Sequence, residues 1–127
     1  MNLQRFIIQT GMGIDQHGQD MTKAAQRAVE NAIRPNCLCG LKEILNVSSM
    51  DDIMVEVTIA APYPDKVNEQ AVLEMLPFGR RSCKIVQGGM IVAGLKESNL
   101  GDKNDEYLIA NACVIVKIDL DRVKIRN

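Results

Sequence analysis

Ionisable side chains gather in one short stretch of the sequence, just after a pair of glycines. Asp15, His17 and Asp20 lie within six residues of one another, and Lys23 and Arg27 follow, four residues apart. Residues four apart on a helix share a face, so both cations would lie on one side of a helix that starts near Asp20. A helix N-terminus also presents unpaired N–H groups and a partial positive charge. The stretch therefore predicts a pocket for a small anionic molecule, such as a carboxylate or a phosphate.

His17 is the single histidine and lies in a glycine-flanked loop rather than on an apolar stripe. An imidazole titrates near neutral pH and acts as a general acid or base when a carboxylate orients its ring. Asp15 or Asp20 could orient it, and we expect His17 and Asp15 to be the catalytic residues of any reaction here. A merely exposed histidine is the alternative. A metal site is not expected, because three ligands on so short a loop need an unusual turn to converge.

The expected ligand-binding residues are two glycines and three charged residues, namely Gly13, Gly18, Asp20, Lys23 and Arg27. A structural explanation competes with this one. Asp20 is a good helix N-cap whatever the function, and Lys23 and Arg27 could form a solvated face with acidic partners. The sequence identifies no cofactor, since its glycine patterns match neither a dinucleotide-binding nor a phosphate-binding loop.

Helices and strands alternate along the chain. The expected elements are a strand at 5–9, a helix at 20–34, a short helical turn at 38–45, a strand at 53–60, a helix at 65–76, and strands at 82–93 and 106–118. The paired glycines Gly11 and Gly13 suit a turn or a close backbone approach, and Gln87-Gly88-Gly89 suits a bulge or a close approach. This order predicts an α+β fold, with a four-stranded mixed sheet and two helices on one of its faces.

The last predicted strand is apolar on both faces. Residues from Leu108 to Ile118 alternate on one side, but Ile109, Cys113 and Ile115 make the other side largely apolar as well. Two helices cannot cover both faces of the sheet, and a monomer rarely exposes an apolar face of this size. We therefore expect a homo-oligomer in which another subunit covers the open face.

The overall composition limits the kinds of partner. The 127 residues are 46% hydrophobic and 24% charged with a net charge of −1, which is typical of one globular domain spanning residues 1–127. Without a basic patch, no nucleic-acid partner is expected. The apolar run at 6–8 is too short for a signal peptide or a membrane span. We expect a cytoplasmic protein with free cysteines, and Cys37-Leu-Cys39 lacks the usual spacing and second ligand pair of a zinc site.

One string of residues carries a family resemblance. It runs Gly11-Met-Gly-Ile-Asp-Gln-His-Gly-Gln-Asp-Met-Thr-Lys-Ala-Ala-Gln-Arg-Ala, and Val55-Glu-Val-Thr-Ile-Ala follows further along the chain. Both resemble a small family of conserved hypothetical proteins of bacteria and plants that was first defined from a Listeria protein. The resemblance extends through nearly the whole chain. It implies one domain and an important loop around His17, and it implies no particular activity.

The order of elements is also similar to that of the trimeric chorismate mutase of bacilli and the small YjgF-type trimers, especially in the run from Val55 to Glu74. In those folds three sheets pack their open faces into a barrel-like core, and ligands bind in clefts between subunits. The resemblance therefore implies a trimer. It transfers no activity, because the arginine and glutamate set of the mutase has no match here.

Two kinds of function are compatible with the sequence. The first is a homo-oligomer that binds a small anionic metabolite at subunit interfaces, with acid–base catalysis by His17. The second is a non-catalytic metabolite-binding regulator or structural assembly protein, in which the stretch from Asp15 to Arg27 only shapes an interface. Convergence of His17, Asp15 and Lys23 on a concave pocket favours the first, and mutual pairing across a flat contact favours the second.

Overall fold

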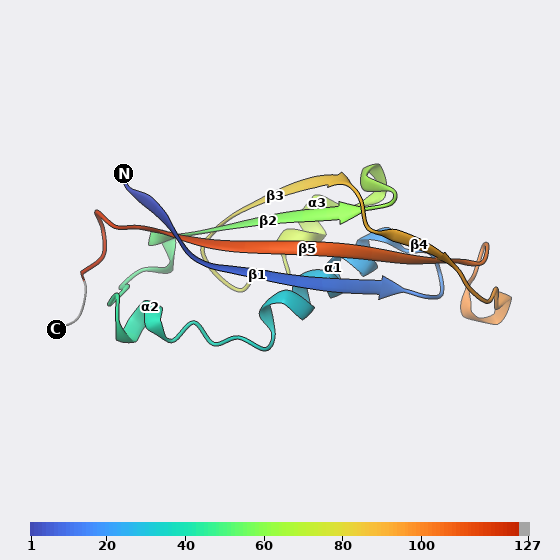
Figure 1. Cartoon of the computed structure of the whole chain (residues 1–127), viewed down its shortest axis with the longest axis horizontal. Coiled ribbons are helices and arrows are strands. Elements are labelled where there is room, and N and C mark those ends of the chain that lie inside the picture. The colour runs from blue at the N-terminus through green and yellow to red at the C-terminus, as the bar shows by residue number, and fades with distance from the viewer. Residues whose placement is uncertain (125–127) are drawn as a thin grey trace.

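A mixed five-stranded sheet forms the centre of the protein in a computed structural model that describes residues 1–124 (Figure 1). The strands are β1 (Leu3–Asp15), β2 (Ile53–Ala61), β3 (Arg80–Gln87), β4 (Met90–Ala93) and β5 (Glu106–Asp119). β5 lies between β1 and β2 and is antiparallel to both, whereas β3 is parallel to β2. β4 pairs with the beginning of β5, beyond the end of β2. The α+β class with a mixed sheet is as expected, but the prediction of four strands was wrong.

The additional strand arises because the predicted strand at 82–93 is broken at Gly88 and Gly89. The N–H of Gly88 donates to the carbonyl of Ala61 at 3.0 Å, and Gly89 adopts a φ of +68°. A Cβ on Gly89 would collide with the carbonyl oxygen of Ile109, so the backbones approach closely there. The chain thus pairs with β2 as β3, leaves that strand at the two glycines, and then pairs with β5 as β4.

The helices are α1 (Met21–Ile33), α2 (Gly40–Glu43) and α3 (Glu69–Leu73), and α1 and α3 lie on the same face of the sheet (Figure 1). α1 and α2 match the predicted helix and short turn. The second predicted helix, at 65–76, was too long. Val67 has an extended backbone, with φ −86° and ψ 125°, and its side chain is buried, so it separates a 3-10 turn at Pro64–Lys66 from α3. No helix within residues 1–124 is long and apolar enough to cross a membrane.

α1 packs directly on β1, which extends well beyond the predicted strand at 5–9. Gly11 and Gly13 continue the strand instead of turning the chain. A Cβ on either glycine would collide with the backbone of α1, at Ala28 and Ala32 for Gly11 and at Ala24 and Ala28 for Gly13. The close backbone approach is thus the explanation that applies to these glycines, and the alanines of α1 permit it.

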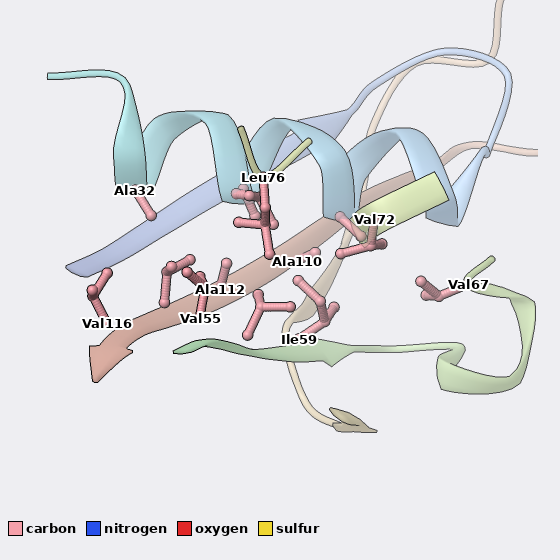
Figure 2. Packing of buried hydrophobic residues seen from close by; sticks show 14 of the residues in the cluster. Ala32, Val55, Ile59, Val67, Val72, Leu76, Ala110, Ala112 and Val116 are labelled. Carbon is pink, nitrogen blue, oxygen red and sulfur yellow. The ribbon is translucent and has the colours of Figure 1, made fainter. Parts of the chain in front are cut away.

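Aliphatic side chains fill the layer between the helices and the sheet (Figure 2). Alternate residues of β2 and β5, from Ile53 to Ala61 and from Leu108 to Ile118, point into this layer and are each at most 4% exposed. Their alternation confirms the predicted period of two.

The opposite face of the sheet carries a band of apolar side chains. No helix of residues 1–124 covers this face (Figure 1). Ile8 and Met12 of β1 are 53% and 51% exposed. In the strand register Ile8 lies beside Ile115 of β5, and Ile14 lies beside Ile109. The sheet therefore has one filled face and one open face, as the last strand predicted.

Candidate functional site

Asp15 closes the junction between β1 and α1. Its carboxylate is buried, and Oδ2 accepts a hydrogen bond from the backbone N–H of Asp20 at 2.7 Å. Oδ1 accepts from Nη1 of Arg27 at 3.1 Å, and the same nitrogen donates to the carbonyl of Ile14 at 2.6 Å. Arg27 and Asp15 thus form an ion pair that ties the helix to the strand. This is the structural role that competed with anion binding for Arg27.

Asp20 is the N-cap of α1, as predicted, since its Oδ1 accepts from the backbone N–H of Lys23 at 3.1 Å. Lys23 is exposed, and its ammonium group has no ion-pair partner among residues 1–124. Gly13 faces the backbone of Ala24 and Ala28 and so serves helix packing. Of the two predicted cations, Arg27 is paired with a carboxylate of the protein, and Lys23 is not.

His17 pairs with Asp102, and not with Asp15 or Asp20 as expected. Its Nδ1 lies 2.7 Å from Oδ2 of Asp102. An ionised carboxylate only accepts hydrogen bonds, so the proton lies on Nδ1. Nε2 has no hydrogen-bond partner among residues 1–124, and the side chain is 28% exposed. Asp15 is already occupied by Asp20 and Arg27, which explains the difference.

Asp102 holds together the loops at this end of the sheet. Oδ1 accepts from the N–H of Gly18 at 2.8 Å and from Nε2 of Gln19 at 3.1 Å, and Oδ2 accepts from the N–H of Glu97 at 2.8 Å. Burial by itself would raise the pKa of Asp102, but the hydrogen bonds from Glu97, His17, Gly18 and Gln19 together hold it well below its ordinary value. The carboxylate is therefore ionised at neutral pH and orients the His17 ring.

The ring of His17 packs edge-on against Tyr107, with centroids 5.9 Å apart and an interplanar angle of 70°. The hydroxyl of Tyr63 donates to the carboxylate of Glu106, the residue before Tyr107, at 2.8 Å from Oε2. That hydrogen bond raises the pKa of Tyr63 above its ordinary value, with burial and the charge of Glu106 adding to it. His17 is thus an oriented imidazole with one free ring nitrogen, which is the arrangement a general acid or base requires.

Among residues 1–124, no three His, Cys, Asp or Glu side chains are grouped so that they could share a metal ion. Cys37 and Cys39 are free and exposed, and Cys83 and Cys113 are free and half-buried. Burial raises the pKa of Cys83 to about 11, with the charge of Glu69 adding to the effect. Cys83 is therefore a protonated thiol at neutral pH and fits the predicted role of a small apolar strand residue.

A cleft of about 550 Å³ opens on the helix side of the sheet, at the far end of α1 from His17. Its buried lining residues are Gln9, Leu41, Val55, Leu76, Val114 and Val116. Figure 2 shows Val55, Leu76 and Val116 among the buried side chains between α1 and the sheet. The charged lining residues Arg34, Lys42 and Glu43 lie at the exposed rim. The cleft therefore has an apolar depth and a polar mouth.

Gln9 places a polar group in this apolar depth. It is 6% exposed and lies beside Val114 in the register of β1 and β5. Its carboxamide has no hydrogen-bond partner among residues 1–124, although its polar atoms remain reachable from the cleft. Water in the cleft can reach these atoms, and a ligand that enters the cleft would take the place of that water. The amide donors and acceptor of Gln9 are therefore free to pair with a molecule in the cleft.

Comparison with known proteins agrees with the resemblance drawn from the loop around His17. A family model described as "Conserved hypothetical protein (Lin0512_fam)" matches residues 5–116. The chain belongs to this family. A crystal structure of an FtsZ-like protein of unknown function from Nostoc punctiforme is 51% identical to this Lin0512 chain, with a TM-score of 0.85, and covers 94% of this chain and 98% of its own. No curated protein matches the chain.

Two functional candidates of this Lin0512 protein were missed in the sequence. Asp102 lies 85 positions from His17, in a polar loop that indicated only turns. Gln9 left a detectable signal, because it is a polar residue at a position of β1 that points into the core. The cleft itself has no sequence signal, since its walls come from five separate parts of the chain.

Proposed function

We propose that this Lin0512 chain is a small-molecule binding protein whose ligand occupies the cleft beside α1 and α2. One observation carries the proposal: the cleft measures about 550 Å³, and the side chains at its depth are aliphatic apart from Gln9. Ligand pockets in proteins are typically about 300–1,000 Å³, mostly apolar, with a few polar groups that orient the ligand. The cleft has this composition.

The buried part of the cleft favours a ligand that is largely apolar. Val55, Val114 and Val116 are each at most 4% exposed and form the floor of the cleft. Apolar surface that leaves water gains about 25 cal/mol per Å², so each ~100 Å² of apolar surface that the ligand and the cleft bury together would gain roughly 2.5 kcal/mol before the entropy cost of binding. This gain supports reversible binding rather than a permanently held group.

Fluorescence of N-phenyl-1-naphthylamine, a neutral apolar dye, tests the proposal. Leu38 lies at the rim and is partly buried, so Leu38→Trp should fill the cleft and weaken dye binding by about tenfold or more. Leu95, which is 63% exposed and lies after β4, provides the matched control, and Leu95→Trp should bind the dye as the wild type does. Equal binding by the Leu38 variant would refute the proposed site.

A second candidate function is acid–base catalysis by His17 on a small anionic molecule, with Lys23 as the cation that attracts it. The contact of 2.7 Å between His17 and the buried carboxylate of Asp102 supports it, because the contact fixes the ring and leaves Nε2 free to take or give a proton. The two candidate functions use different sites, because His17 and the cleft lie at opposite ends of α1. Loss of turnover in His17→Ala with an intact cleft would separate them.

We also propose that the chain functions as a homo-oligomer, and specifically as a trimer in which the open sheet face is buried, as in the chorismate-mutase-like trimers. Exposed Ile8 and Met12, together with partly buried Ile109 and Ile115, support it. Such a contact leaves the cleft accessible, because the cleft lies on the other side of the sheet.

A further inference from the structure

We infer that the ligand of the cleft is a neutral molecule with a carboxamide-like edge, that is, an N–H donor beside a carbonyl acceptor, which pairs with Gln9. The inference rests on the proposed binding function and specifies its ligand class. It starts from the chemistry of one side chain. A glutamine amide offers an acceptor oxygen and a two-donor nitrogen side by side. A primary amide or a lactam presents the complementary pair and forms two hydrogen bonds with it.

The surroundings of Gln9 explain why a ligand must supply these hydrogen bonds. Val114 lies beside it in the sheet, and Leu41 and Leu76 line the same cleft. None of these side chains can donate or accept. Gln9 is 6% exposed and its amide has no protein partner among residues 1–124, so a molecule in the cleft is what can pair with it. The amide is thus positioned to orient a ligand in the cleft.

The charged residues of the cleft lie at its exposed rim, away from Gln9. Arg34 is 79% exposed, and its Nη1 already donates to Oε1 of Glu30 at 3.0 Å. Lys42 and Glu43 are exposed neighbours of opposite charge at the rim. A carboxylate beside Gln9 would lose its water without gaining a cation, which disfavours it strongly against a neutral amide. The ligand class therefore differs from the anionic one that the loop around His17 predicted.

A stability measurement distinguishes whether the amide of Gln9 serves ligand binding or the stability of the fold. In Gln9→Leu, an amide without a protein partner becomes an apolar group of similar size, so the Tm should stay the same or rise. Gln26 is the matched control, because its Nε2 donates to the carbonyl of Ala71 at 3.0 Å, and Gln26→Leu should lower the Tm. A fall in Tm for Gln9→Leu as large as that for Gln26→Leu would assign Gln9 a structural role and overturn the inference.

Calorimetric titration of three probes of similar shape tests the ligand class directly: 4-ethylbenzamide, 4-ethylbenzoate and 4-ethyltoluene, at pH 7. Wild-type protein should bind the amide at least about tenfold more tightly than the ionised benzoate. Gln9→Leu should lose about tenfold for the amide and keep its affinity for the toluene. Equal binding of amide and benzoate, or an unchanged amide affinity in Gln9→Leu, would overturn the inference but leave the cleft as a binding site. Binding of none of the three would overturn the proposed function as well.

Discussion

Asp102 determines how the end of the molecule around His17 responds to acid. Its carboxylate accepts hydrogen bonds from four groups, and its pKa is lower in the folded protein than the ordinary value of about 3.9. The unfolded chain therefore binds a proton more readily, so the stabilisation is complete above about pH 5 and is lost as the pH falls from about 4 toward the lower folded pKa. We expect the Tm to fall over this acidic range.

Thermal melts of Asp102→Asn between about pH 2 and pH 7 test this expectation. The variant should melt at a lower temperature than the wild type at pH 7, and its Tm should depend less on pH below about pH 4. Asp105→Asn, which changes an exposed carboxyl of the same loop, is the control and should follow the wild type. A wild-type acid profile in Asp102→Asn would show that the hydrogen bonds of Asp102 contribute little.

Single residues were predictable where their role is local. Asp20 is a cap because it precedes an amphipathic run, and the sequence alone indicated this. His17 was recognised as a candidate, but its partner Asp102 was not, because a contact between two loops 85 positions apart follows from the sheet register and not from spacing. Gln9 is detectable as a polar residue at an inward-facing strand position, but its candidate role follows only once the cleft beside it is known.

The contact between β1 and α1 depends on glycine at two positions of the strand. A Cβ on Gly13 would collide with backbone atoms of Ala24 and Ala28, which cannot rotate away as a side chain could. Gly13→Ala should therefore lower the free energy of unfolding by about 1–3 kcal/mol or more. Gly40→Ala is the control, because its Cβ would meet only side chains at 3.4 Å or beyond, and it should change stability little. Chemical denaturation measures both, and equal stabilities would contradict the proposed packing.

Secondary structure was predictable where one side of an element is buried throughout. β2 and α1 have clean periods, and both were placed nearly correctly. The second helix was overestimated because Val67 continues the apolar pattern, although its backbone is extended. The predicted strand at 82–93 pairs first with β2 and then with β5. In the sequence, only the glycines at 88 and 89 indicated this change of partner.

The whole molecule presents an apolar sheet face whose expected cover is another subunit. Ile109→Asp or Ile115→Asp should dissociate the assembly, because an unpaired charge in a desolvated contact is costly. Ile44, which is 58% exposed at the end of α2 on the helix side, is the control, and Ile44→Asp should leave the assembly intact. Light scattering measures the particle mass. A monomeric wild type at micromolar concentration would contradict the oligomer.

The most direct test of the central claim is methyl NMR of the protein bound to N-phenyl-1-naphthylamine. We predict intermolecular contacts from the dye to the methyl groups of Val55, Leu76, Val114 and Val116, which line the cleft. The methyl groups of Ile8 and Ile115, on the other face of the sheet, should be unaffected. Dye contacts with Ile8 and Ile115 and none with the four cleft residues would show that the open sheet face, and not the cleft, is the apolar binding surface of this protein.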